Sequence, residues 1–135
     1  MKFTVGVDII DVARIGRMLD EHPAACAEIF TELEWAYCAG KKNRTAHLAA
    51  RFAAKEAVLK ALGTGLGPGM RWTDVEVNND PLGRPHLVLR GLPAAMVTGR
   101  GGSAEVSLSH TRTHAIANAA VFFPAPEQAP PTSGN

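Results

Sequence analysis

Two carboxylates in predicted regular elements stand out as candidate metal ligands. Asp8 interrupts an apolar run near the N-terminus, and Glu56 lies in an alanine-rich stretch typical of a helix. An ionised carboxylate among apolar residues must be paired or bound to a metal. Two carboxylates with phosphate oxygens and water suit Mg²⁺, whereas zinc is disfavoured because no Cys or His set has ligand spacing. The structural alternatives for Asp8 are a salt bridge to Arg14 and a cap on the next helix.

Three cations accompany Glu56 on the same stretch, namely Arg51, Lys55 and Lys60. Glu56 and Lys60 are four residues apart, so a surface ion pair worth about 0.2–0.5 kcal/mol is the simplest alternative to a functional role. Lys55 falls inside the stripe of large apolar residues, where it must extend its ammonium outward or meet a polar partner. A polyanionic ligand bridged by a metal would account for all four charges.

A third polar segment, Ser107–Thr111, places hydroxyl groups and the imidazole of His110 at the end of a predicted strand. Such a set can bind phosphate, and ordinary turn chemistry is the alternative. The richest run of positive charge is too short and too mixed to indicate duplex DNA binding, and it is either a solvated helix end or an anion site. It consists of Lys41, Lys42, Arg44, His47 and Arg51.

The N-terminal half of the chain must position the two carboxylates and the cations that accompany Glu56. Lys2–Ile10 predicts a buried strand, because it is rich in apolar and partly β-branched residues, namely Phe3, Val5, Val7, Ile9 and Ile10. Helices are expected over 12–19, with Asp11 as N-cap, over 24–29, and over 32–39. The last begins with the capping-box pattern of Thr31 and Glu34 and ends at Gly40.

Ala46–Leu62 is the strongest helical segment, since it is free of Gly and Pro and rich in alanine. On a helical projection Leu48, Phe52, Leu59 and Leu62 form a stripe about 80° wide. Ala49, Ala53 and Ala57 flank this stripe and permit close backbone approach. A glycine-rich loop follows the helix.

The C-terminal half predicts two antiparallel pairs. Strands are expected over 72–78 and 86–89, joined by a turn, and over 105–109 and 115–123, joined across 110–114, with a short helix over 92–97. The chain is read as one domain over 1–123 followed by a disordered proline-rich tail over 124–135.

Composition excludes several classes of protein. The 135 residues are 46% apolar and 20% charged with a net charge of +1, typical of a soluble domain and unlike a nucleic-acid-binding protein. Cys26 and Cys38 are read as reduced, buried thiols. Neither a signal peptide nor an apolar run long enough for a membrane span is evident, so a cytoplasmic location is expected.

Four motifs occur in the order and approximate spacing of a known family. They are Gly6-Val7-Asp8-Ile9, Arg51-Phe52-Ala53-Ala54-Lys55-Glu56-Ala57 with Lys60-Ala61 and Gly63-Thr64-Gly65, Gly83-Arg84-Pro85, and Ser107-Leu108-Ser109-His110. Together they resemble the AcpS-type phosphopantetheinyl transferases (holo-acyl-carrier-protein synthases), over residues 3–122. Thr4 departs from the family's Gly-Ile-Gly opening without removing a ligand.

The resemblance implies a role for each motif residue. Asp8 and Glu56 are expected to hold Mg²⁺, Lys60 to lie near the reacting phosphate as the third catalytic residue, and Arg14 to contact the acyl carrier protein. Arg51 and His110 resemble residues that hold the 3′-phosphate of coenzyme A. The full set expected to bind coenzyme A is Arg51, Lys55, Gly83, Arg84, Pro85, Ser109, His110 and Thr111.

The resemblance also implies an α+β fold, with a small antiparallel sheet packed on a long central helix, and a homotrimer with active sites between subunits. The expected reaction transfers 4′-phosphopantetheine from coenzyme A to a carrier serine and releases adenosine 3′,5′-bisphosphate. Glu56, a water on the metal and Lys60 are alternative bases, and carriers of fatty acid, polyketide and peptide synthesis are alternative acceptors.

Two functions from other classes compete with this interpretation. A non-catalytic module that binds coenzyme A or a nucleotide is disfavoured by the intact set of Asp8, Glu56 and Lys60. A metal-dependent nuclease is disfavoured because many nucleases place Glu and Lys two apart on a strand, whereas Glu56 and Lys60 are four apart on a predicted helix.

Overall fold

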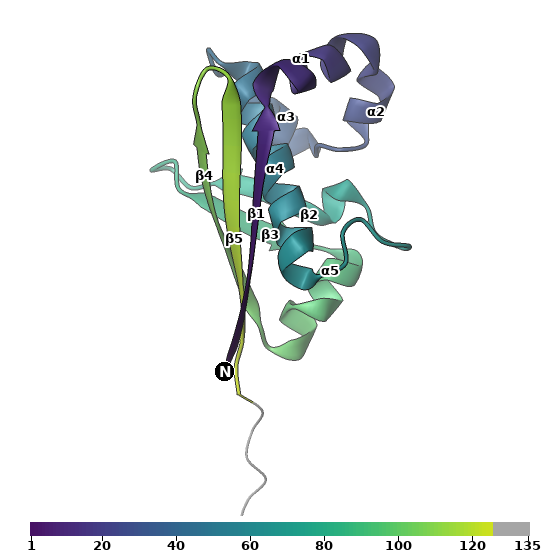
Figure 1. The fold of residues 1–135 in the computed structure, drawn as a ribbon, viewed down its shortest axis with the longest axis vertical. Helices are drawn as coiled ribbons and strands as arrows, with labels where there is room; N and C mark the ends of the chain where they lie inside the picture. The colour runs from purple at the N-terminus through teal and green to yellow at the C-terminus, as the bar shows by residue number, and fades with distance from the viewer. Residues whose placement is uncertain (126–135) are drawn as a thin grey trace, which may run out of the picture.

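A long helix between two antiparallel sheets organises the chain in the computed structural model, which describes residues 1–125 (Figure 1). The elements in chain order are β1 (Lys2–Asp11), α1 (Val12–Glu21), α2 (Pro23–Ala27), α3 (Glu32–Ala39), α4 (Arg44–Leu62), η1 (Trp72–Asp74), β2 (Val75–Asn79), β3 (Pro85–Leu89), α5 (Gly91–Met96), η2 (Thr98–Arg100), β4 (Ser103–His110) and β5 (His114–Phe123).

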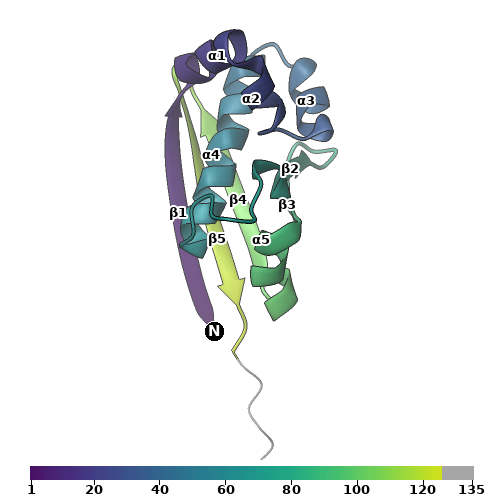
Figure 2. The same cartoon turned by 90° about the vertical axis from the view of Figure 1, so that its right-hand side faces the viewer.

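The elements form layers around α4. The larger sheet has the strand order β1-β5-β4, so that β1 and β4 are its two edges. Helix α4 lies against one face of this sheet, and the smaller β2–β3 sheet lies on the other side of α4 with α3 and α5 (Figure 2). This arrangement confirms the predicted α+β fold with a small antiparallel sheet on a long helix.

Helix α4 forms where the sequence predicts it and begins two residues earlier, at Arg44. It ends at Gly63, which adopts a left-handed φ of 77° that glycine accommodates without strain. The predicted apolar stripe was too narrow, because Ala49, Ala53 and Ala57 are also fully buried. The alanine face is therefore used inside the chain.

Gly6 marks the closest approach of β1 to α4. A Cβ atom at this position would lie 2.0 Å from the carbonyl oxygen of Ala57 and 2.8 Å from the amide nitrogen of Ala61. Both are backbone atoms of the helix, so they cannot rotate away as a side chain would. The strand and the helix pack this closely only because Gly6 has no side chain.

The opposite face of β1 corrects the prediction of a fully buried strand. Phe3, Val5, Val7 and Ile9 are between 54% and 71% exposed. Side chains alternate along a strand, so Gly6 and Ile10 face α4 while these four face outward. Ile116 of β5, which pairs with Ile9, is also 41% exposed. We call the surface formed by Phe3, Val5, Val7, Ile9 and Ile116 the outer sheet face. None of the helices and strands within residues 1–125 covers it (Figure 2).

The remaining local predictions are largely confirmed. The capping box opens α3: the amide of Glu34 donates to Thr31 Oγ1 at 3.3 Å, and the amide of Thr31 donates to Glu34 Oε1 at 2.9 Å. Asp11 stands at the N-cap of α1 without making a side-chain cap, because its carboxylate lies 3.3 Å from the imidazole of His114.

Two other predictions on the chain's C-terminal half have different outcomes. The strand predicted from residue 72 begins at Val75, because residues 72–74 form a 3₁₀ turn, and the β4–β5 hairpin is present. Residues 126–135, most of the predicted tail, lie outside the described residues. Within the part that the structure covers, no helix has the length and apolar character needed to cross a bilayer.

We predict that Gly6→Ala destabilises the protein by about 2–3 kcal/mol, the upper part of the range for over-packed sites. The added methyl group would force β1 away from α4. Urea denaturation followed by circular dichroism measures the change. Gly16→Ala in α1 is the matched control: its added Cβ would meet only Thr45 Cγ2, at an ordinary 3.7 Å. The control should be neutral or slightly stabilising, and equal losses in both variants would contradict the packing argument.

Candidate functional site

The first group of predicted residues meets at the β1 edge of the sheet. Asp8 faces α4 from the inner face of β1, and its Oδ1 accepts a hydrogen bond of 2.8 Å from Lys60 Nζ. Lys60 also donates to the backbone oxygen of Val7 at 3.1 Å. The ion pairs expected from the sequence as structural alternatives are not the ones that form. Asp8 pairs with Lys60 rather than with Arg14, and Lys60 pairs with Asp8 rather than with Glu56. We call Asp8, Glu56 and Lys60 the carboxylate site.

Glu56 is held close enough to Asp8 for the two charges to interact. Partial burial raises the pKa of Glu56, and the negative charge of Asp8 raises that pKa further. Lys60 and Arg14 of α1 oppose this shift with their positive charges. The hydrogen bond to Asp8 raises the pKa of Lys60, which keeps its amine charged. A raised carboxylate pKa beside a second carboxylate is typical of a functional site.

The carboxylate site could supply two carboxylate ligands to a divalent cation. The Asp8 side chain is only 11% exposed, and its Oδ2 atom is buried without a hydrogen-bond partner. Such an orphaned oxygen next to a second carboxylate fits a divalent cation. Within residues 1–125, no cluster of three or more His, Cys, Asp and Glu side chains could hold a metal. Mg²⁺ would therefore take its remaining ligands from water and a phosphorylated substrate.

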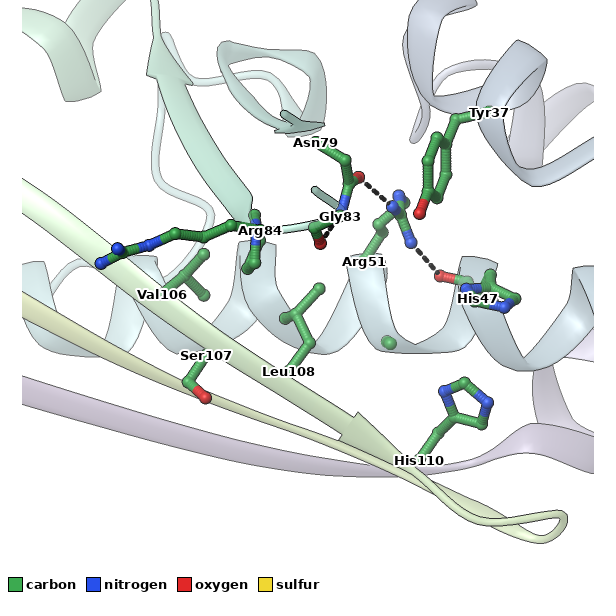
Figure 3. A pocket seen from close by; sticks show the side chains of 12 residues that line it. Tyr37, His47, Arg51, Asn79, Gly83, Arg84, Val106, Ser107, Leu108 and His110 are labelled. Carbon is green, nitrogen blue, oxygen red and sulfur yellow. Dashed lines mark hydrogen bonds between the residues drawn. The ribbon is translucent and has the colours of Figure 1, made fainter. Parts of the chain in front are cut away.

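A second group of predicted residues lines a pocket of about 430 Å³ on another side of α4 (Figure 3). It lies between α4, the β2–β3 turn and β4. We call it the cationic pocket, because four basic side chains, His47, Arg51, Arg84 and His110, contribute to it. Its other lining residues are Tyr37, Ala50, Asn79, Gly83, Pro85, Val106, Ser107 and Leu108.

Arg51 is the most buried basic residue of this pocket. Its guanidinium donates through Nη1 to the backbone oxygen of His47 at 3.1 Å and through Nη2 to Asn79 Oδ1, and it lies 4.5 Å from the centre of the Tyr37 ring. Its Nε is buried without a partner. Arg51 thus combines an unpaired donor with a place in the pocket lining, and its positive charge can attract an anionic ligand.

The β2–β3 turn supplies the opposite wall. Asp80 Oδ1 accepts hydrogen bonds from the amides of Leu82 and Arg84, at 2.9 and 2.8 Å, which closes the turn. These backbone hydrogen bonds lower the pKa of Asp80. Gly83, with a left-handed φ of 87°, points its carbonyl oxygen at the Asn79 amide at 3.0 Å. Asn79 therefore joins the turn to Arg51.

Lys55 does not belong to either site, and this corrects the expectation that it contacts coenzyme A. Its side chain is completely buried, and its ammonium donates to Glu34 Oε1 at 2.8 Å, to the backbone oxygen of Trp72 at 3.2 Å and to that of Val75. An ammonium has three donors, so none is left for a ligand. Burial lowers the pKa of Lys55, and Glu34 opposes this effect.

Two further predicted contacts lie apart from the cationic pocket. Ser109 is exposed and, by strand alternation, points to the opposite face from His110. Thr111 lies in the β4–β5 turn beside a neighbouring cavity, which His110 also lines. The sequence indicated His47 only as a member of the basic run from Lys41 to Arg51, and it did not indicate Tyr37 or Asn79. His47 and Arg51 are four residues apart on one helix, whereas Tyr37 and Asn79 come from other elements.

The two sites lie on opposite sides of α4 in one chain. Arg51 and Glu56 are five residues apart, which turns their side chains about 140° from each other around the helix. Asp8 comes from one edge strand of the sheet, β1, and His110 from the other, β4. No residue of the carboxylate site lines the cationic pocket.

Known proteins share both the sequence and the fold. Residues 4–120 match the profile of the 4′-phosphopantetheinyl transferase superfamily. The holo-(acyl-carrier-protein) synthase of Geobacter sulfurreducens is 48% identical over 119 residues, which cover 87% of this chain and 94% of that protein. The same enzyme of Moorella thermoacetica is 44% identical over 117 residues, covering 86% of this chain and 91% of that protein.

Two similar solved structures are complexes with a ligand. The holo-(acyl-carrier-protein) synthase of Bacillus anthracis, solved in complex with CoA (3′,5′-ADP), has a TM-score of 0.75 and 35% identity, covering 90% of this chain and 96% of that one. An ACPS–CoA complex from Chronobacterium ammoniagenes has a TM-score of 0.80 and 29% identity, covering 93% of this chain and 100% of that one.

We predict that Glu56→Gln stabilises the metal-free protein near neutral pH by less than about 1 kcal/mol, since water screens a partly exposed carboxylate. The raised pKa of Glu56 means that its ionised form is disfavoured in the folded state. The stability it contributes is present at low pH and lost as pH rises through the folded-state pKa. The gain in Glu56→Gln should therefore disappear in acid. Thermal unfolding across this pH range measures it.

Magnesium provides the second half of this test. Millimolar magnesium chloride should raise the melting temperature of the wild type and leave that of Glu56→Gln nearly unchanged, because binding to the folded state alone stabilises it. Glu21→Gln, at an exposed position at the end of α1, is the control and should respond like the wild type. An equal magnesium effect in Glu56→Gln would show that Glu56 holds no metal.

Proposed function

The chain belongs to the 4′-phosphopantetheinyl transferase superfamily, and on this premise we propose that it transfers 4′-phosphopantetheine from coenzyme A to a serine of an acyl carrier protein, with Mg²⁺ and with release of adenosine 3′,5′-bisphosphate. The observation that carries the proposal is the carboxylate site. Asp8 and Lys60, 52 residues apart, meet beside Glu56, and Asp8 keeps one buried oxygen free. The acyl carrier protein is proposed as the acceptor because similar proteins are named holo-(acyl-carrier-protein) synthase.

The cationic pocket is the proposed nucleotide half of the site. Arg51, with its unused Nε donor, and His110 would hold the 3′-phosphate, and the backbone of Gly83, Arg84 and Pro85 would contact the adenine. The relatives solved with coenzyme A support this donor. Thr111 extends the same surface through the cavity that it shares with His110.

Asp8 and Glu56 are the residues that would hold magnesium. When bound there, Mg²⁺ would neutralise charge on the phosphoryl oxygens of the donor. Lys60, whose raised pKa keeps it cationic, would stabilise the charge that develops on the oxygen bridging the two phosphates.

The transfer forms one phosphorus–oxygen bond and breaks another. The carrier serine oxygen attacks the β-phosphorus, next to the pantetheine; the bond from that phosphorus to the bridging oxygen breaks; and adenosine 3′,5′-bisphosphate leaves with the bonding electrons. The serine proton must pass to a base. The raised pKa of Lys60 opposes an amine base. Arg14, exposed on α1 near Glu56, would contact the carrier as its serine approaches.

Mass spectrometry of an apo acyl carrier protein tests the function. Incubation with the wild-type chain, coenzyme A and magnesium should add the mass of one phosphopantetheine to the carrier. Asp8→Ala and Glu56→Ala should abolish transfer while retaining the wild-type circular dichroism spectrum. A folded, coenzyme A-binding chain that leaves the carrier unmodified would indicate a binding module, and transfer in excess chelator would exclude the metal.

We also propose that the protein is a homotrimer with active sites between subunits. Two observations support this assembly. The outer sheet face exposes five apolar side chains on neighbouring strands, as interfaces between subunits do. The carboxylate site and the cationic pocket lie on opposite sides of α4, so a neighbouring copy can supply the half that one chain holds elsewhere. The buried alanine face plays no part in this contact.

We predict that two defective variants complement each other in a mixed oligomer. Asp8→Ala and Arg51→Ala disable different halves of the site. If each site combines one half from each of two neighbouring chains, co-expression at equal levels should restore about one quarter of the wild-type sites. Activity at low coenzyme A concentration measures this recovery. A monomer by light scattering at micromolar concentration, or a mixture no more active than its parts, would contradict the interfacial site.

We predict that Arg51 and Lys60 affect different kinetic constants. The 3′-phosphate does not change charge during the reaction, so Arg51→Ala should raise the KM for coenzyme A more than it lowers kcat. Arg51→Lys keeps the positive charge but removes the planar guanidinium that can bind a phosphate through two hydrogen bonds, so it separates the two contributions. Lys60→Ala should mainly lower kcat, because charge changes at the phosphoryl centre.

Dephospho-coenzyme A, which lacks the 3′-phosphate, is the control substrate for both variants. With it, Arg51→Ala should cost little relative to the wild type, while Lys60→Ala should cost as much as before. An equal loss for Arg51→Ala on both substrates would mean that Arg51 acts only through its contacts with Asn79 and Tyr37.

A further inference from the structure

Two histidines from different elements meet at one end of the cationic pocket. His47 lies on α4, one turn before Arg51, and His110 ends β4 (Figure 3). Their ring centres are 4.9 Å apart, with an interplanar angle of 68°. Both rings line the pocket. His47 has no part in the function proposed above, although it stands as close to the pocket as His110 does.

His47 is surrounded by positive charge. The charged groups that act on it are His110 from β4, Arg51 from α4 and Lys41 from the segment between α3 and α4. Tyr37 of α3 packs on its other side, with ring centres 6.3 Å apart. Burial lowers the pKa of His47, and the charges of His110, Arg51 and Lys41 lower it further. Without a ligand, His47 is therefore neutral near neutral pH.

A bound anion would reverse this balance. A phosphate monoester carries nearly two negative charges near neutral pH, and each imidazolium that faces it gains a charge-assisted hydrogen bond. The repulsion between the two rings and Arg51 is then offset by attraction to a common partner. Because the rings are in contact, both lie within reach of the same small anion.

We propose that His47 is a further phosphate-binding residue, and that the His47–His110 pair takes up a proton when a phosphate monoester enters the cationic pocket. This inference rests on the proposed function, which supplies the 3′-phosphate of coenzyme A as that monoester. The pair then selects coenzyme A over its dephospho form, because only the 3′-phosphate brings the negative charge that favours protonation of His47.

The proposal fixes the sign of a pH effect on binding. A group whose pKa is higher in the complex than in the free protein adds affinity at low pH and loses it as pH rises through the pKa of the complex. Affinity for coenzyme A should therefore fall on the alkaline side, by at most about tenfold per pH unit for one coupled proton. Dephospho-coenzyme A should lack this dependence.

Titration calorimetry of the full-length protein tests the inference. Binding of coenzyme A is measured near neutral pH in buffers with different ionisation enthalpies, which reports the number of protons taken up. His47→Phe is the matched variant, because phenylalanine keeps a ring against Tyr37 and His110 but has no titratable nitrogen. The phosphate's own titration is common to both proteins and cancels in the comparison.

The expected result is a smaller proton uptake in His47→Phe, with coenzyme A bound at least about tenfold more weakly, as for the loss of one charge-assisted hydrogen bond. Affinity for dephospho-coenzyme A should be the same in both proteins. Unchanged proton uptake, or an equal loss of affinity for both ligands, would overturn the role of His47 alone. Failure of the wild type to bind coenzyme A at all would overturn the proposed function with it.

Discussion

The buried ion pair between Lys55 and Glu34 joins α4 to α3 and to strand β2. Lys55 comes from α4 and Glu34 from α3, and the same carboxylate accepts from the amide of Val77 in β2. Lys55 also binds two backbone oxygens of the segment that leads into β2. Removing one partner of such a pair costs about 3–5 kcal/mol, because the other charge stays buried. The β2–β3 turn, and with it one wall of the cationic pocket, is thereby placed against α4.

Helix α4 separates two electrostatic environments. On the β1 side, two carboxylates repel each other and draw in Lys60. On the β4 side, the guanidinium of Arg51 and the rings of His47 and His110 line a pocket. A metal cation fits the first environment and a phosphate the second.

The sequence was a good guide to local structure, because capping, glycine and proline signals act over a few residues, as in the Thr31–Glu34 box and the Gly63 cap of α4. Asp8 stood out because a carboxylate in an apolar strand is costly, and Glu56 because three cations accompany it on one helix. Tyr37 and Asn79 could not be found in this way, since only the folded chain brings them to Arg51. The fate of Lys55 depended on Glu34, 21 residues earlier, which no periodicity reveals.

The contact between Gly6 and α4 determines which residue reaches Glu56. A shift of β1 by one position would turn the outer sheet face inward and bring the side chain of Val5 or Val7 against Ala57. A shift by two would keep the faces but place Thr4 or Asp8 against the helix backbone. In each case a side chain would occupy space that holds none. The strand is therefore fixed in the alignment that puts a carboxylate, rather than an alkyl group, beside Glu56. In this way Gly6, which has no side chain, determines the position of Asp8 two residues later.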